Sequence, residues 1–205
     1  MSILISVFIL NYQKLVPNNE ADLAKMIATV PAAWYYGWNG LRIISVILLF
    51  IITGLALYER MQAKAPYLTL VLLIAGSAGA AIEITRIIVL MEGLQRVVQD
   101  SSALKVFWAL ANGLEVASGH AFAWSFLVSG CAILRTRALS RALGWFDILV
   151  GILWIPQLTQ PQTMLPQLIG LLVFLLSLVA ALWTGIALLR QKQPQEATRE
   201  MAEAR

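Results

Sequence analysis

The sequence predicts an all-α, polytopic transmembrane helix bundle, with five full spans and a short N-terminal apolar segment that can belong to a sixth. Three observations predict this class. Of the 205 residues, 60% are hydrophobic and 13% are charged, whereas soluble domains have about 45–50% apolar and about 25% charged residues. The mean hydropathy is +0.77. Because about 20 helical residues cross a bilayer, the length allows five or six helices and no sizeable aqueous domain.

The N-terminal residues 1–10 are apolar but too short to span a bilayer. They lack the basic start and the small-residue cleavage site of a signal peptide. We therefore expect an interfacial segment or part of a first helix. Residues 11–39 form a mixed loop, in which Trp34 and Trp38 suit a membrane–water boundary.

Five apolar stretches follow, and we expect each to cross the membrane: 41–58, 67–91, 106–134, 142–156 and 167–189. The third has 29 residues and is long enough to tilt, whereas the fourth has 15 and requires local thinning of the bilayer. Residues 1–190 then form a single transmembrane bundle, and a polar tail follows at 191–205.

Basic residues indicate the orientation of the bundle. They gather in the loops 59–66 and 135–141 and at the start of the tail, and these alternate with the charge-mixed loop 92–105 and the uncharged loop 157–166. The positive-inside rule places the first group and the C-terminus in the cytoplasm. The formal charge of +4 therefore reflects topology rather than a nucleic-acid-binding face. The expected partner is the lipid bilayer.

Ionisable residues within the spans indicate a structural or functional role, because placing one in lipid at mid-helix costs about 2.5 kcal/mol or more. Five such residues lie inside the expected spans: Glu83, Arg86, Glu115, His120 and Asp147. Glu83 and Arg86 are three residues apart and share a helix face. Helical rise places the five in order of depth, from Arg86 and Glu83 outside to Asp147 nearest the cytoplasm. Arg42 is excluded, because it lies at the outer end of a span and can snorkel.

Two interpretations of this group remain open. In the first it is a path for protons or a pocket for a small polar ligand, with Glu115 as the protonatable group and Asp147 orienting His120. Arg86 would then neutralise Glu83 or Glu115. In the second the residues are interhelical pairs, Arg86 with Glu115 and His120 with Asp147, which set helix register.

The only histidine, His120, allows a further alternative. A single imidazole can serve as one axial ligand of a haem or chlorophyll, so the chain can be a structural or accessory subunit of a larger membrane complex or a homo-oligomer. The sequence itself requires no cofactor and predicts no metal site. It identifies no catalytic residues, because Ser118 and His120 lie on different helix faces and only an unsupported carboxylate pair, Glu83 with Glu115, remains. An enzymatic function is therefore disfavoured.

Small residues predict how two spans pack. The stretch 76–81 on the second span is rich in glycine, alanine and serine, and Gly113, Ala117 and Ala121 recur every four residues on the third. Such faces allow helices to approach closely. We expect the two spans to pack together and to bring Glu83, Arg86 and Glu115 into one neighbourhood.

The stretch Ser129-Gly130-Cys131-Ala132-Ile133-Leu134-Arg135-Thr136, with Leu139, Arg141, Leu143-Gly144-Trp145 and Gly151, resembles a family. Its members are small bacterial six-helix integral membrane proteins, known only as a domain of unknown function. The resemblance covers the chain from about residue 41 onward. It implies six helices and a bacterial cytoplasmic (inner) membrane location, but no activity. The chain departs from the family at Ser140, where proline is usual, and in its short segment 1–10.

Overall fold

The computed structural model describes residues 32–97, 101–155 and 172–190. Its helices follow in the order α3 (Ala32–Val46), the π-helix η1 (Ile47–Ile52), α4 (Thr53–Met61), α5 (Pro66–Val97), α6 (Ser101–Thr136) and α7 (Arg141–Trp154). A last helix covers Leu172–Arg190. The expected N-terminal segment 1–10 and the polar tail 191–205 lie outside the described residues.

Four helices in the described ranges are long and apolar enough to cross a membrane: Tyr35–Met61, Pro66–Glu92, Ala103–Thr136 and Leu172–Arg190. They correspond to the first, second, third and fifth expected spans. The fourth expected span, 142–156, contains α7, whose 14 residues are fewer than the ~20 that a helix needs to cross. The structure therefore gives four candidate spans where the sequence predicted five. Helices satisfy their own backbone hydrogen bonds, as a lipid environment requires.

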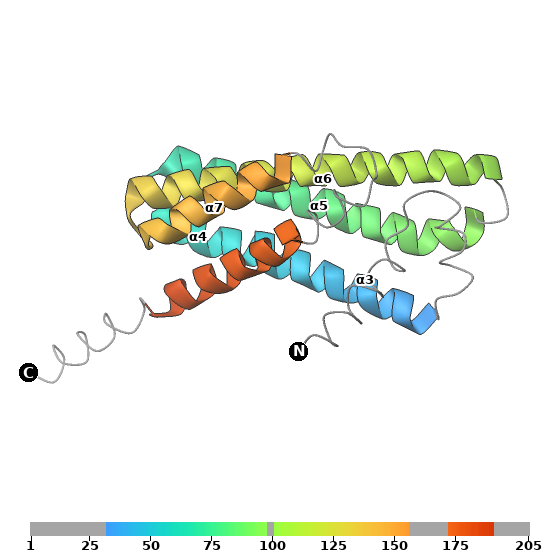
Figure 1. The fold of residues 1–205 in the computed structure, drawn as a ribbon, viewed down its shortest axis with the longest axis horizontal. Coiled ribbons are helices and arrows are strands. Elements are labelled where there is room, and N and C mark those ends of the chain that lie inside the picture. The colour runs from blue at the N-terminus through green and yellow to red at the C-terminus, as the bar shows by residue number, and fades with distance from the viewer. Residues whose placement is uncertain (1–31, 98–100, 156–171, 191–205) are drawn as a thin grey trace, which may run out of the picture. The chain divides into compact units, whose positions relative to one another are not determined.

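The chain divides into two compact units. Among the described residues, the first unit consists of α3, residues 81–97 of α5 and residues 101–117 of α6. The second unit consists of η1, α4, residues 66–80 of α5, residues 118–136 of α6, α7 and the Leu172–Arg190 helix. The two longest helices, α5 and α6 (Figure 1), each contribute residues to both units.

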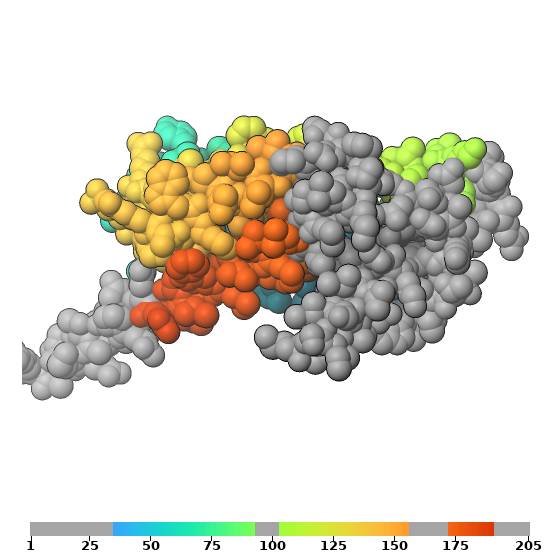
Figure 2. All heavy atoms as spheres, viewed as in Figure 1, coloured from blue at the N-terminus to red at the C-terminus, as the bar shows by residue number. Residues whose placement is uncertain are grey.

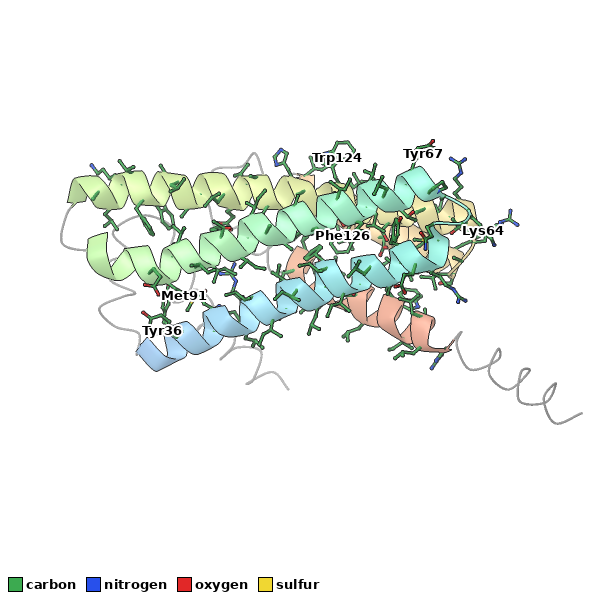
Figure 3. All side chains as sticks on the ribbon, turned by 180° about the vertical axis from the view of Figure 1, so that it is seen from behind. Tyr36, Lys64, Tyr67, Met91, Trp124 and Phe126 are labelled. Carbon is green, nitrogen blue, oxygen red and sulfur yellow. The ribbon has the colours of Figure 1, made fainter. Side chains whose placement is uncertain are left out.

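The apolar core described for the second unit lies around the turn that joins α4 to α5. Buried side chains from α4, α5, α6, α7 and the turn before α7 form it: Leu57, Met61, Leu72, Ala132, Ile133, Leu139 and Leu143. Helix α5 begins at Pro66, a residue that suits a first helical position because it has no amide hydrogen to satisfy. Figure 3 shows Lys64 and Tyr67 at this turn.

The expected close packing between the second and third spans is confirmed in the second unit. A Cβ atom at Gly79 would lie 2.7 Å from the Phe122 ring, and one at Gly76 would lie 3.2 Å from Ser125 Oγ. A side chain at position 79 would therefore force α5 and α6 apart or displace the Phe122 ring, and one at position 76 would make a tight contact. Gly113 differs from this expectation, because nothing lies within 4 Å of a Cβ there.

Large apolar side chains cover the outside of the helices. Leu182 is 67% exposed and Trp124 61% exposed, and Figure 3 shows Trp124 on the outward face of α6. Phe126, two residues further, contacts Phe50 with ring centroids 5.7 Å apart. Exposed apolar patches of this kind mark a surface that meets something other than water. Lipid is the environment that suits such helices.

Candidate functional site

Four charged side chains form an ion-pair network in the first unit. Arg86 donates to both oxygens of Glu83, from Nε to Oε2 at 2.9 Å and from Nη2 to Oε1 at 2.8 Å. Arg42 Nη2 also donates to Glu83 Oε1, at 2.6 Å. Arg86 Nη1 reaches Glu115 Oε2 at 3.3 Å. A paired arginine–carboxylate fork of this geometry is among the stronger hydrogen-bonded contacts in proteins.

The centre of this network is buried and its ends are not. Glu83 is 6% exposed and Arg86 7% exposed, whereas the Glu115 side chain is 60% exposed. Two guanidinium groups face two carboxylates, so the formal charges cancel. The network therefore offsets the cost of removing charge from water by pairing within the chain. This arrangement is suited to holding α3, α5 and α6 in register.

Two of the pairs were predicted from the sequence and are confirmed: Glu83 with Arg86, and Arg86 with Glu115. Arg42 was missed, because a position near the end of a span was taken to mean a snorkelling side chain. The positions of Arg42 and Glu83 along the sequence could have predicted their contact. Helices α4 and α5 are joined by a turn at Gln62–Ala65. Arg42 lies 20 residues before this turn and Glu83 lies 18 residues after it, so an antiparallel pair of helices brings them to about the same level.

A second polar group lies in the second unit, where α7 packs closely on α6. A Cβ atom at Gly130 would lie 2.5 Å from the Gly144 carbonyl oxygen, and one at Gly151 would lie 2.9 Å from the Leu127 amide nitrogen. Only glycine at these positions allows the two backbones to come so near. Asp147 lies between Gly144 and Gly151 on the same face of α7. The close packing therefore presses Asp147 against α6.

Asp147 is 2% exposed and is only partly satisfied. Ser129 Oγ of α6 donates to its Oδ2 at 2.7 Å, while its Oδ1 has no hydrogen-bond partner among the described residues. Buried polar atoms are almost always paired, so each exception calls for an explanation. The Ser129 hydrogen bond holds the carboxyl group in a fixed position.

Asp147 lines a small cavity of about 30 Å3, which we name the Asp147 cavity. Its polar lining residues are Thr53, Ser125, Ser129, Asp147 and Thr184, and its other lining residues are apolar or glycine. A cavity of this size holds about one water-sized body. The walls come from η1, α4, α5, α6, α7 and the Leu172–Arg190 helix. Figure 2 shows α7 beside that last helix, and Trp154 Nε1 donates to Ser177 Oγ between them at 3.2 Å.

The expected pairing of His120 with Asp147 is wrong. Asp147 bonds to Ser129, which lies nine residues further along α6 than His120, a rise of about 13 Å. His120 is exposed, whereas Asp147 is buried. The structure therefore divides the sequence-predicted residues between the two units: ion pairs join Glu83, Arg86 and Glu115 in the first unit, and Asp147 lines a cavity of the second.

No cluster of three or more histidine, cysteine, aspartate or glutamate residues that could hold a metal ion occurs within residues 32–97, 101–155 and 172–190. Haem or pigment binding at His120 stays a prediction. Glu83 and Glu115 both bond to Arg86, and neither lines the Asp147 cavity. No family model, curated protein or solved structure matches the chain in comparisons with known proteins.

Proposed function

We propose that the chain is an integral membrane protein that binds a small polar species, a proton, an ion or a small ligand, in the Asp147 cavity. The observation that carries the proposal is the buried Asp147 carboxyl group, which borders a cavity and leaves Oδ1 without a partner among the described residues. An ionisable group inside a membrane protein suggests a functional site, and most strongly where its polar atoms are not all paired within the chain. A bound species would supply the missing partner.

The ion-pair network is the weaker candidate for this role. Its four charges cancel, and Glu83 accepts hydrogen bonds at both oxygens. A species entering there would have to displace an arginine from a carboxylate, at a cost of about 3–5 kcal/mol for a broken buried pair. We therefore assign the network to holding the helices in register and the Asp147 cavity to binding.

We further propose how the chain lies in the membrane. Helix α7 crosses as a fifth, short span, and residues 1–10 belong to a sixth. The arginine-bearing turn between α6 and α7 and the C-terminus face the cytoplasm. The bacterial inner membrane is the proposed location, as the resemblance of residues 129–151 to the six-helix family implies. Reporter fusions after residues 62, 99 and 137 test the orientation, and a cytoplasmic reporter signal at residue 99 would contradict it.

A second candidate function is that of a structural or accessory subunit. The exposed apolar side chains of the Leu172–Arg190 helix, among them Leu182 and Leu189, favour lateral packing against another membrane protein. Pigment binding through His120 would belong to this role. An absorption spectrum of the gently purified protein tests it, because a bound haem or chlorophyll colours the protein and a colourless preparation counts against it.

Thermal unfolding of the purified full chain in detergent tests binding at Asp147. A species that binds the folded state raises Tm. The test compares Tm at pH values from 5 to 9. It also compares Tm in Na⁺, K⁺, Li⁺ or NH₄⁺ with Tm in choline at constant ionic strength. We expect at least one of these species to raise Tm in the wild-type protein. Asp147→Asn, which keeps the size of the side chain, abolishes that rise.

Glu115→Gln is the matched control. It removes a carboxylate that lies outside the Asp147 cavity and is largely exposed, so the rise in Tm should persist in it. A rise that is equal in Asp147→Asn and the wild-type protein would refute the proposal. So would the absence of any response in the wild-type protein. A rise lost in Glu115→Gln but kept in Asp147→Asn would instead assign binding to the network.

A further inference from the structure

We infer that the species bound in the Asp147 cavity is a monovalent metal cation, Na⁺. This inference rests on the proposed function and names its ligand. The charge of the cavity lining favours a monovalent cation. Asp147 is the one acidic residue in the lining of the cavity, and no basic residue lines it. One cation of charge +1 neutralises one carboxylate. A divalent ion would leave an uncompensated positive charge, and such ions are bound by more carboxylate and carbonyl oxygens than this cavity offers.

The free space in the cavity and the oxygen atoms around it favour a metal cation over a proton. A proton on Asp147 needs no cavity, yet about 30 Å3 of space lies beside the carboxyl group. Hydroxyl-bearing side chains, Ser125, Thr53 and Thr184 among them, surround that space. The Thr53 and Thr184 hydroxyls donate their hydrogens to backbone carbonyls, at 2.9 Å to Leu48 and 2.8 Å to Ala180. Their oxygen lone pairs remain available, and hard cations prefer such oxygen ligands.

The backbone beside the cavity departs from regular α-helix. The π-helix η1 (Ile47–Ile52) supplies two lining residues, Leu49 and Phe50. π-Helical turns are rare and frequently occur at functional sites. In membrane transporters, unwound backbone carbonyls in interrupted helices coordinate Na⁺ near the bilayer midplane, and a π-helical turn is a milder departure from regular α-helix. The one irregular segment assigned among the described helices thus borders the one buried carboxyl group with an unpaired oxygen. Na⁺ is favoured over K⁺, because so small a space suits the smaller ion.

Equilibrium binding of radioactive ²²Na⁺ to the purified full chain tests the inference, with choline chloride keeping the ionic strength constant. We expect saturable binding of one Na⁺ per chain and weaker competition by K⁺ than by unlabelled Na⁺. Asp147→Asn should weaken binding at least tenfold, while Glu115→Gln leaves it unchanged. Saturable binding that persists in Asp147→Asn would overturn both the inference and the proposed function.

Two variants keep the test valid if Asp147→Asn does not fold. Thr184→Val and Ser125→Ala each remove one hydroxyl from the cavity and keep or reduce the volume of the side chain. We expect each to weaken ²²Na⁺ binding several-fold in protein that still unfolds cooperatively. Unchanged binding in both variants would overturn the inference.

The failures of the two proposals are distinguishable. If no ²²Na⁺ binds, but acid or another cation still raises Tm through Asp147, then the inference is wrong and the proposed function stands. If no ²²Na⁺ binds and no species raises Tm, the cavity holds water only and both are wrong.

Discussion

Replacing Glu83 by glutamine removes the carboxylate on which Arg42 and Arg86 converge. Three charge-assisted hydrogen bonds, of 2.6, 2.8 and 2.9 Å, are weakened or lost. Arg86 is 7% exposed, so its guanidinium group cannot regain water. Its contact to Glu115, at 3.3 Å, is longer than its two hydrogen bonds to Glu83. Glu83→Gln therefore removes the carboxylate that this buried guanidinium group contacts at 2.8 and 2.9 Å.

The expected cost follows from this geometry. Removing one partner of a buried ion pair costs about 3–5 kcal/mol, and the lower value applies here because the glutamine oxygen still accepts a hydrogen bond. Glu115→Gln is the matched control, because that side chain is 60% exposed and such pairs contribute about 0–1 kcal/mol. We therefore expect Glu83→Gln to lower the free energy of unfolding by at least ~2 kcal/mol more than Glu115→Gln does.

Reversible unfolding in mixed micelles, followed by the fluorescence of the seven tryptophans, measures this difference. The double variant Glu83→Gln with Arg86→Gln should lose less free energy of unfolding than the two single variants lose together, because it removes the Arg86 charge along with its carboxylate partner. Average interhelical hydrogen bonds in membranes contribute only about 0.6 kcal/mol. Equal losses near that value for Glu83→Gln and Glu115→Gln would refute the assignment of a buried network centred on Glu83.

Two further predictions concern the packing and start of α7. Gly151→Ala should lower the free energy of unfolding by about 1–3 kcal/mol, as overpacking does, because its Cβ would lie 2.9 Å from the Leu127 amide nitrogen. The control Gly185→Ala has nothing within 4 Å of the new Cβ, and a loss equal to that of Gly151→Ala would contradict the packing argument. Ser140→Ala should lower the free energy of unfolding by about 1 kcal/mol, because Ser140 Oγ accepts a hydrogen bond from the Leu143 amide at the start of α7, at 3.3 Å. Unfolding in mixed micelles measures this loss. An unchanged free energy of unfolding would mean that the cap does not stabilise the helix.

The helical membrane class could be predicted from composition alone, because a chain so poor in charge has few stable alternatives. The pair Glu83 with Arg86 was equally accessible, since a separation of three residues places two side chains on one helix face wherever the helix lies. Predictions of this kind need only local geometry. They hold in the structure because tertiary packing does not alter them.

The partner of Asp147 could not be predicted in the same way. Depth along each helix was estimated from the sequence, but the face that α7 turns toward α6 depends on glycine contacts between the two helices. His120 was chosen as the partner because it is ionisable. Ser129 is neutral, so a search for ionisable partners does not find it, although its hydroxyl group is the donor. The spacing of Gly144, Asp147 and Gly151 is the signal that could have identified the buried face.

Arg42 illustrates a different error. Its side chain was judged by its own distance from the end of a span, whereas the outcome depended on what the neighbouring helix presents at the same level. Glu83 stands at that level across the turn at Gln62–Ala65. Considering the two helices as an antiparallel pair would have joined Arg42 to the network.

The central claim is that the Asp147 cavity holds a small polar occupant bound to Asp147. An experimental density map of the full chain in Na⁺, at a resolution that reveals ordered solvent and ions, tests it most directly. We predict a single density peak in the cavity, within coordinating distance of Asp147 Oδ1 and near the hydroxyl groups of Ser125 and Thr184. A cavity closed by its own side chains, with Oδ1 bonded to a protein donor and no peak beside it, would contradict the claim.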